Sequence, residues 1–331
     1  MISVKLSLLL PVALVAMLAQ SVGPLDASFD ARDVRSPLRL TRTFELPNVA
    51  GRIDHMALDR ASNHLFVAEY GNGSVDEIDL SSGKLAERIA GLRGPQGVAW
   101  LPRQGELAVA SDDGSLRFYR RGNERPVAVI QFGDDADNVR LDGRNGNLVV
   151  GYGSGALAVV DASTHHVLRQ LKLPAHPEAF QLIGSRVFVN VPGAHQLVIA
   201  DLDQTRIINS IGTGLLGGNF PMAIDQSGSR IAVAYRFPSR LSVIDTKSGE
   251  TSWAAPICGD ADDLYFSAAR ILAVCGEGHV DLVADAGDHR VISIATRRGA
   301  RTGLLADGDR LFVAVPARVE HAAVWEFSLP H

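Results

Sequence analysis

The chain has 331 residues, a formal net charge of −5 and a hydrophobic content of 46%. That hydrophobic content is sufficient for a sizeable core, while the acidic balance gives no global electrostatic attraction to nucleic acid or to an anionic membrane surface. Helical periodicity is nearly absent after residue 30, so a fold built from β-strands is indicated.

The N-terminal segment has the pattern of an export signal. Lys5 precedes the apolar run Leu6–Leu18, and small residues follow it. A run of about 13 residues is too short to cross a bilayer, which needs ~20. We therefore expect a signal peptide within residues 1–27, cleaved near Ala19 or Ala27, and a linker over residues 28–37. The mature protein would be periplasmic or secreted, without membrane contact after cleavage.

Hydrophobic two-strand units follow one another at intervals of roughly 41 residues. They begin near Asp54, Gln96, Asp137, Glu178, Pro221, Asp262 and Thr302. A period of about 40–50 residues built from short strands is typical of a β-propeller, in which each repeat forms one four-stranded blade. The spacing predicts an all-β fold, a single seven-bladed β-propeller domain over residues 38–331.

The first repeat shows how a blade is read from the sequence. Asp54–Asp59 is predicted as the innermost strand, Leu65–Ala68 as the second, Ser74–Leu80 as the third and Leu85–Ile89 as the outer strand. Glycine, serine and asparagine residues between these segments supply the turns.

The last repeat ends without a full outer strand. Upstream of the first blade, Leu38–Leu46 is an unassigned strand of suitable length. We predict that this N-terminal strand completes the last blade and closes the ring, because closure removes exposed sheet edges.

The chain has two cysteines, Cys258 and Cys275, which the repeat register places on loops at the same face. An oxidising compartment permits a disulfide between them. Two buried thiols are the second simple interpretation, and a metal or redox role is the third.

The sequence "LFVAEYGNGSVDEIDLSSGK" (65–84) resembles the YVTN-type propeller repeat. Over roughly residues 40–331 the chain is similar to the YncE-like exported seven-bladed propellers. Blade openings such as "GRIDHMALD" (51–59), "DDADNVRLD" (134–142) and "DADDLYF" (260–266) are more specific than the generic repeat. The resemblance implies the propeller fold and export. Nucleic-acid binding has been proposed for such proteins, but this acidic chain has no basic stripe with interleaved aromatic residues, so no nucleic-acid partner is expected.

The inner strands have one apolar side and one mixed side. Two residues after each opening stand Met56, Val98, Val139, Phe180, Ala223, Leu264 and Leu304, which we expect to pack between blades. Because strand side chains alternate, the adjacent positions should face the central channel. Among small residues, those positions hold His55, Asn138, Arg140, Gln181, Asp263 and Tyr265.

The openings themselves should form the rim of the channel. They carry Asp54, Gln96, Asp137, Glu178, Asp262 and Thr302, with His176 and Arg301 beside them. Polar residues that differ from blade to blade predict an asymmetric pocket at the channel mouth. The simpler alternative is a water-filled channel whose carboxylates cap loop amides and contact Arg140 and Arg301.

We expect this pocket to bind a small polar molecule or a divalent metal ion. The predicted ligand-binding residues are Asp54, Gln96, Asn138, Gln181, Asp263, Tyr265 and Thr302. The predicted metal ligands are Asp54, His55, Asp137, Glu178 and Asp262, whose oxygen atoms suit Ca, Mg or Mn and whose imidazole admits Zn or Fe.

Two further functions remain open. A metal-assisted hydrolase or lyase of the lactone or sugar-acid type would use His55 or His176 as the general base. Arg140 or Arg301 would then hold a substrate carboxylate or stabilise an enolate. A scaffold would instead engage a protein partner on the loop face. We expect a monomer without haem, nicotinamide or quinone, because the corresponding sequence motifs are missing.

Overall fold

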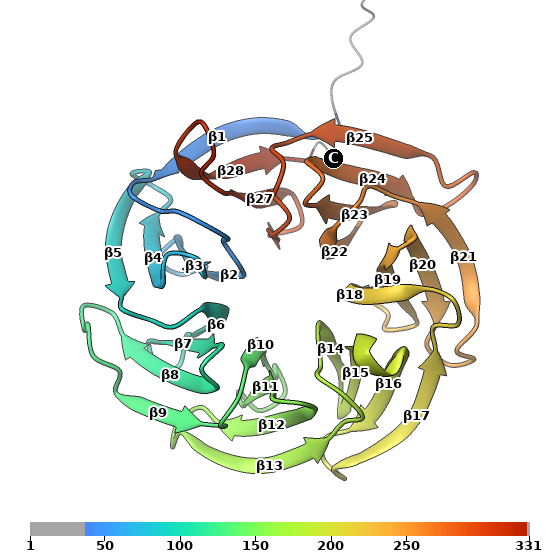
Figure 1. The fold of residues 1–331 in the computed structure, drawn as a ribbon, viewed down its shortest axis with the longest axis horizontal. Coiled ribbons are helices and arrows are strands. Elements are labelled where there is room, and N and C mark those ends of the chain that lie inside the picture. The colour runs from blue at the N-terminus through green and yellow to red at the C-terminus, as the bar shows by residue number, and fades with distance from the viewer. Residues whose placement is uncertain (1–36, 330–331) are drawn as a thin grey trace, which may run out of the picture. The chain divides into compact units, whose positions relative to one another are not determined.

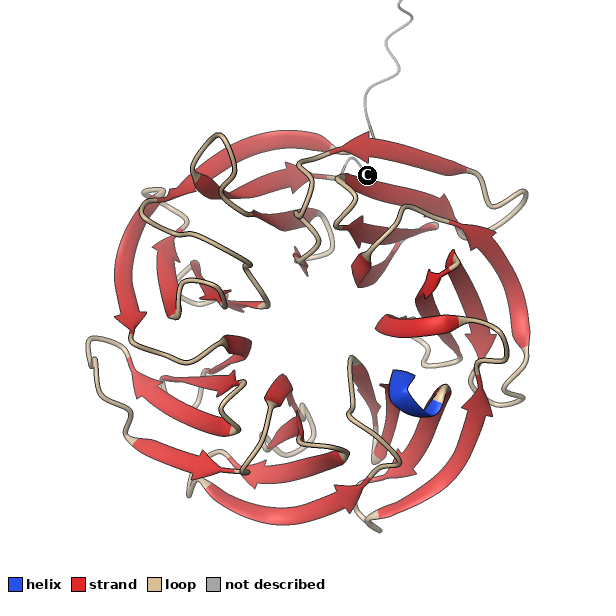
Figure 2. Cartoon of the chain, in the orientation of Figure 1, coloured by secondary structure: helices blue, strands red, loops and turns tan. Residues whose placement is uncertain are grey.

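The computed structural model describes residues 37–329, which form a ring of seven antiparallel four-stranded sheets (Figures 1 and 2). The predicted seven-bladed β-propeller is thereby confirmed. Within residues 37–329 the only helical element is one 3-10 turn, η1 (Pro192–Ala194), and no helix has the length and apolarity of a membrane span. The predicted signal peptide, and all but the last residue of the predicted linker, lie outside the described residues.

The strands follow the predicted blade order, from the channel outwards. Blade 1 contains β2 (Met56–Asp59), β3 (His64–Glu69), β4 (Ser74–Asp79) and β5 (Lys84–Ala90), and blade 2 contains β6 (Pro95–Leu101), β7 (Glu106–Ser111), β8 (Ser115–Arg120) and β9 (Ala128–Gln131). Blade 3 contains β10 (Ala136–Leu141), β11 (Leu148–Tyr152), β12 (Ala156–Asp161) and β13 (His166–Lys172). Blade 4 contains β14 (Phe180–Ile183), β15 (Arg186–Val191), β16 (Gln196–Asp201) and β17 (Arg206–Gly212). Blade 5 contains β18 (Gly217–Ile224), β19 (Arg230–Phe237), β20 (Ser239–Asp245) and β21 (Thr251–Pro256). Blade 6 contains β22 (Ala261–Ser267), β23 (Arg270–Cys275), β24 (His279–Ala284) and β25 (Val291–Ala295). Blade 7 contains β26 (Gly303–Ala306), β27 (Arg310–Val315), β28 (Ala322–Ser328) and β1 (Arg39–Leu46).

The N-terminal strand closes the ring as predicted. β1 pairs antiparallel with β28 and occupies the outer place in the sheet β1-β28-β27-β26 (Figure 1). On its inner side Phe44 and Leu46 are buried in one cluster with Leu65 and Val67 of blade 1. Closure therefore joins the two ends of the chain through backbone hydrogen bonds and a shared apolar core.

The predicted packing side of the inner strands is confirmed. Six of its seven residues are buried, namely Met56, Val98, Val139, Phe180, Ala223 and Leu264. The seventh, Leu304, is partly buried against the cluster that contains Phe312. Leucine, valine and alanine in the second and third strands fill the rest of the space between blades.

The blade openings are irregular. In four blades the register between the first two strands shifts at the opening, between Pro95 and Val98, Ala136 and Val139, Asn219 and Met222, and Ala261 and Asp263. An extra residue on one strand is a β-bulge, which interrupts the alternation of side chains. Two consecutive polar residues of an opening can therefore face the channel together.

Two of the predicted strand bounds differ from the structure. The first inner strand begins at Met56 rather than Asp54, although the amide of Asp54 still donates to the carbonyl of Ala68 at 2.7 Å. The inner strand of blade 5 begins at Gly217, earlier than the predicted Pro221.

Cys258 and Cys275 form a disulfide across a sequence separation of 17 residues. Cys275 is the last residue of β23 and not a loop residue, whereas Cys258 lies between β21 and β22. The backbone amide of Cys258 also donates to Asp281 Oδ2 at 2.7 Å. The disulfide thus fixes the segment that leads into the opening of blade 6.

Candidate functional site

A cavity of about 180 Å³ lies where the inner strands open, and every blade contributes to it. We call it the mouth cavity. It is lined by Arg52, Asp54, His55, Gln96, Asp135, Asp137, Asn138, His176, Glu178, Ala179, Phe220, Arg236, Asp262 and Arg301. Bulged openings position several of these residues: Asp137 and Asn138 are consecutive, yet both line the cavity because the register shifts between Ala136 and Val139.

Many of the sequence-predicted site residues meet in this cavity. The structure brings together Asp54, His55, Gln96, Asp137, Asn138, His176, Glu178, Asp262 and Arg301. It places five others away from the lining: Arg140, Gln181, Asp263, Tyr265 and Thr302.

Four of the residues outside the cavity lining connect neighbouring blades. Gln181 donates to the carbonyl of Met222 at 3.2 Å, and Thr302 donates to the carbonyl of Ile53 at 3.3 Å. Both backbone groups of Gly303 are engaged as well. Asp263 Oδ2 accepts its N–H, and the hydroxyl of Tyr265 donates to its carbonyl, each at 2.8 Å.

Arg140 lies close enough to Asp263 and Tyr265 for its charge to act on both. Burial raises the pKa of Asp263 well above its usual value, and the nearby Asp262 adds to this, whereas the positive charge of Arg140 opposes it. Burial likewise raises the pKa of Tyr265.

One wall of the mouth cavity is a compensated ionic cluster. Arg236 Nη2 contacts Asp262 Oδ1 at 2.6 Å, and Arg301 Nε lies 3.3 Å from Asp262 Oδ2. Both guanidinium groups also contact Asp260 Oδ1, at 3.2 and 3.3 Å. The guanidinium of Arg236 lies 4.1 Å from the ring centroid of Phe220, in cation–π geometry. Each acid of this wall therefore has two arginine partners.

A second chain of contacts links the first three blades. Arg52 forms an ion pair with Asp54 and donates to Gln96 Oε1 at 3.1 Å. Gln96 in turn donates to Asp135 Oδ1 at 2.8 Å. The guanidinium of Arg52 stacks 4.1 Å from the ring of Tyr70, which orients it towards the cavity rim.

The remaining acids, Asp137 and Glu178, are different. Glu178 has no side-chain hydrogen bond or ion pair with another described residue, and the one basic side chain within 4 Å of Asp137 in the described part of the chain is His55, with Nε2 at 3.9 Å. Burial, with repulsion from Asp54, raises the pKa of Asp137 to about 8. Burial, with repulsion from Asp262, raises the pKa of Glu178 to about 7.

The side chain of Asn138 also has an unsatisfied hydrogen-bond acceptor. It is 2% exposed, lines the mouth cavity, and its Oδ1 atom has no hydrogen-bond partner among the described residues. A buried, unpaired amide oxygen carries a cost of about 1–3 kcal/mol, which a bound donor would relieve.

The two histidines differ in how they are held. His176 Nδ1 lies 2.6 Å from the carbonyl of Gly153, so Nδ1 carries the donated proton and Nε2 is left towards Asp135, 3.8 Å away. His55 Nε2 lies 3.8 Å from Asp54 Oδ1 and 3.9 Å from Asp137 Oδ1. Each histidine therefore lies beside a cavity carboxylate, His55 beside Asp137 and His176 beside Asp135.

The described side chains do not form a ready-made metal site. Over residues 37–329 no group of three or more His, Cys, Asp or Glu side chains converges in a way that could hold a metal ion. Metal binding at Asp54, His55, Asp137, Glu178 and Asp262 remains a prediction and would require these side chains to move closer together.

Sequence reasoning missed Arg52, Asp135 and Phe220 because they precede the positions taken as blade openings. Arg236 was not among the predicted ligand, metal or catalytic residues either, although it lines the cavity. The sequence does contain a signal for the first two, since Arg52 and Asp135 each lie two residues before a predicted site acid, Asp54 and Asp137. Comparing the residues that precede each opening would have found them.

Comparison with known proteins supports the fold. No protein-family model and no curated protein matches the sequence. Among solved structures the chain is similar to Kuenenia stuttgartiensis hydrazine synthase, with a TM-score of 0.71 and 15% sequence identity over 81% of this chain and 93% of that chain. At this level of identity the similarity establishes a shared propeller architecture and nothing about chemistry.

Proposed function

We propose that the protein binds a small polar ligand in the mouth cavity and that this ligand carries a positive charge. The observation that supports the proposal is the pair Asp137 and Glu178, which share the cavity without an ion pair to an arginine or lysine among the described residues, although Arg236 partly offsets the charge of Glu178. Buried carboxylates without a counter-charge lose ionisation. A bound cation would restore it, and the raised pKa values of both groups reflect this need.

The size of the cavity limits the ligand. Its volume of about 180 Å³ is smaller than the ~300–1,000 Å³ of pockets for drug-sized molecules. A primary ammonium or guanidinium compound of a few heavy atoms fits this space. Its N–H groups would donate to Asp137 and Glu178, and one further donor would satisfy Asn138 Oδ1.

A divalent metal ion is the second candidate for the same charge. It is favoured by the oxygen-rich lining and by His55, which lies between two carboxylates at 3.8 and 3.9 Å. The hydrolase or lyase alternative would depend on this metal, with His176 as the base, because His55 would be a ligand of the metal. The scaffold alternative would use the loop face around the mouth, where Phe237 is 70% exposed.

We also propose that the protein is exported and related to the YncE-like propellers. The disulfide between Cys258 and Cys275 supports export, because such bonds persist in oxidising compartments. The propeller fold and the repeat sequence support the relationship.

Calorimetric titration with ethanolamine, and with ethylene glycol as its neutral analogue, tests the proposal. We expect saturable binding of ethanolamine alone. Because Asp137 and Glu178 are partly protonated near pH 7, cation binding should release protons, which titration in buffers of different ionisation enthalpy measures. Mg²⁺ and Ca²⁺, titrated separately, test the metal candidate.

The variants Asp137→Asn and Glu178→Gln should each weaken ethanolamine binding at least tenfold. Glu124→Gln, which removes one charge from an exposed site, is the matched control and should leave affinity unchanged. Unchanged affinity in folded Asp137→Asn and Glu178→Gln proteins would contradict the proposal.

A further inference from the structure

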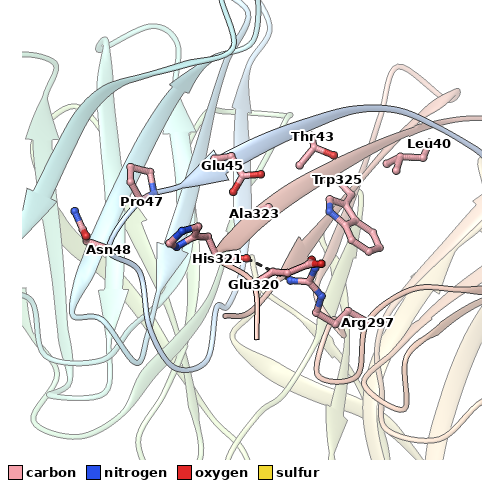
Figure 3. Close-up of a pocket in the computed structure, with 10 residues that line it drawn as sticks. All are labelled: Leu40, Thr43, Glu45, Pro47, Asn48, Arg297, Glu320, His321, Ala323 and Trp325. Carbon is pink, nitrogen blue, oxygen red and sulfur yellow. Dashed lines mark hydrogen bonds and ion pairs between the residues drawn. The ribbon is translucent and has the colours of Figure 1, made fainter. Parts of the chain in front are cut away.

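A second and larger cleft lies away from the channel mouth, on the outer part of blade 7 (Figure 3). Its volume is about 580 Å³, and we call it the outer cleft. β1 contributes Leu40, Thr43 and Glu45 to it. These three residues share one face because the register of β1 against β28 shifts between Leu40 and Arg42.

The outer cleft has an apolar part. Trp325 of β28 lies opposite Thr43 in the strand pairing and is partly exposed, while Leu40 is 47% exposed at one end of β1. Pro47 and Ala323 extend this surface (Figure 3). A pocket of this size with a partly exposed indole is suited to a ligand that has an apolar or aromatic body.

The positive charge of Arg297 in the cleft is neutralised by an ion pair. Arg297 forms an ion pair with Glu320, and its Nη1 donates to the carbonyl of His321 at 3.3 Å. Its guanidinium lies 5.4 Å from the ring centroid of Trp325, and its side chain is only 19% exposed. Arg297 is therefore a neutralised part of the wall rather than a free anion receptor.

One negative charge in the cleft, that of Glu45, is not neutralised by a described residue. Glu45 is exposed, and no ion pair or side-chain hydrogen bond joins it to another residue in the part of the chain that the structure describes. Because the Arg297–Glu320 pair cancels, Glu45 leaves the cleft with a net negative charge. The complementary ligand combines a cation with an apolar surface.

We propose that the outer cleft is a second ligand site, which binds a small amphiphilic amine. The ammonium group would pair with Glu45, and the apolar body would lie against Leu40 and Trp325. This site is independent of the mouth cavity, whose volume and charged lining exclude such a body.

Ligand-observed NMR with three probes tests this site: 3-phenylpropylamine, its neutral analogue 3-phenylpropan-1-ol, and propylamine, which lacks the ring. We expect saturable binding of 3-phenylpropylamine and at least tenfold weaker binding of the other two. Glu45→Gln should weaken 3-phenylpropylamine binding at least tenfold. Glu250→Gln, an exposed carboxylate in blade 5, should leave it unchanged.

The same titration in Asp137→Asn separates the two sites, because it alters only the mouth cavity. Unchanged affinity for 3-phenylpropylamine in Asp137→Asn supports the outer cleft. Affinity that is lost in Asp137→Asn but retained in Glu45→Gln would overturn the proposal. Equal binding of the alcohol and the amine would overturn it as well, because Glu45 would then have no part in recognition.

Discussion

Carboxylates at the blade turns and carboxylates at the channel mouth behave in opposite ways. Asp79, Asp161, Asp201 and Asp245 end the third strand of four blades, and each accepts hydrogen bonds from the backbone of the turn that follows. A side-chain hydrogen bond from Ser82 lowers the pKa of Asp79 most, with the backbone bond adding to it, and the backbone bonds lower the pKa of the other three groups. In the mouth cavity, burial instead raises the pKa values of Asp137, Glu178 and Asp262.

Structural and ligand-binding acids of a repeat protein can be distinguished by whether they recur from repeat to repeat. A carboxylate that recurs at one position of the repeat is stabilised by local backbone donors and serves the fold. A carboxylate that differs between blades, and that local donors do not satisfy, is available for a ligand. Substitutions at turn acids, at mouth acids and at the disulfide should therefore change stability and ligand affinity in different ways.

Loss of the disulfide should have the largest effect on stability. The double variant Cys258→Ser/Cys275→Ser removes a constraint across 17 residues, and we expect the free energy of unfolding to fall by about 3 kcal/mol. Chemical denaturation measures this change. Because Cys258 lies close to Asp260 and Asp262, ligand affinity at the mouth should fall too. Unaltered stability would show that the opening of blade 6 is fixed by its other contacts.

Glu69 tests whether a raised pKa alone marks a binding site. It is fully buried at the end of β3, outside the lining of the mouth cavity, and its Oε1 atom has no hydrogen-bond partner among the described residues. Burial, with repulsion from Asp76, raises its pKa from 4.5 to about 8. The stability that this group contributes is therefore complete below about pH 4.5 and is lost as the pH rises through 8.

Glu69→Gln should remove this loss. We expect little change in unfolding free energy at pH 4.5 and a gain on the order of 2 kcal/mol at pH 8.5, without any change in ligand affinity. Urea denaturation at the two pH values is the measurement. Reduced ethanolamine binding in this variant would mean that the buried acid of β3 and the mouth cavity are coupled.

One substitution made at two sites should give effects of opposite sign. Asp59 is buried at a turn, and hydrogen bonds from Ser62 and Arg121 outweigh the effect of its burial and lower its pKa. The stability that Asp59 contributes is therefore lost as the pH falls below about 3.8. Asp59→Asn should destabilise the protein by about 1 kcal/mol at pH 8. Asp137→Asn should stabilise it by about 1 kcal/mol at pH 8, since the folded state resists ionisation of Asp137. Thermal unfolding of both variants at pH 8 compares them, and a shared sign would remove the distinction between turn and mouth acids.

The sequence predicted the blades better than the site. An apolar residue occupies the same position in every repeat, as Met56 and Val139 do, so the burial of these two residues followed from the pattern. Gln181 and Thr302 were predicted as ligand residues from the same register, but they hydrogen-bond to the backbone of the next blade. A repeat register places a side chain on the channel side of a strand, but it does not specify which neighbour that side chain meets.

What the sequence determined by itself was the number of blades, the closing strand Leu38–Leu46 and the apolar side of the inner strands, because each depends on local spacing and side-chain alternation. The tertiary structure decided which acids are neutralised. Asp262 receives Arg236 and Arg301 from the two neighbouring blades, whereas Asp137 receives neither. It also decided that β1 and the loop before β28 form the outer cleft, since residues such as Glu45 and Glu320 meet only when the ring closes.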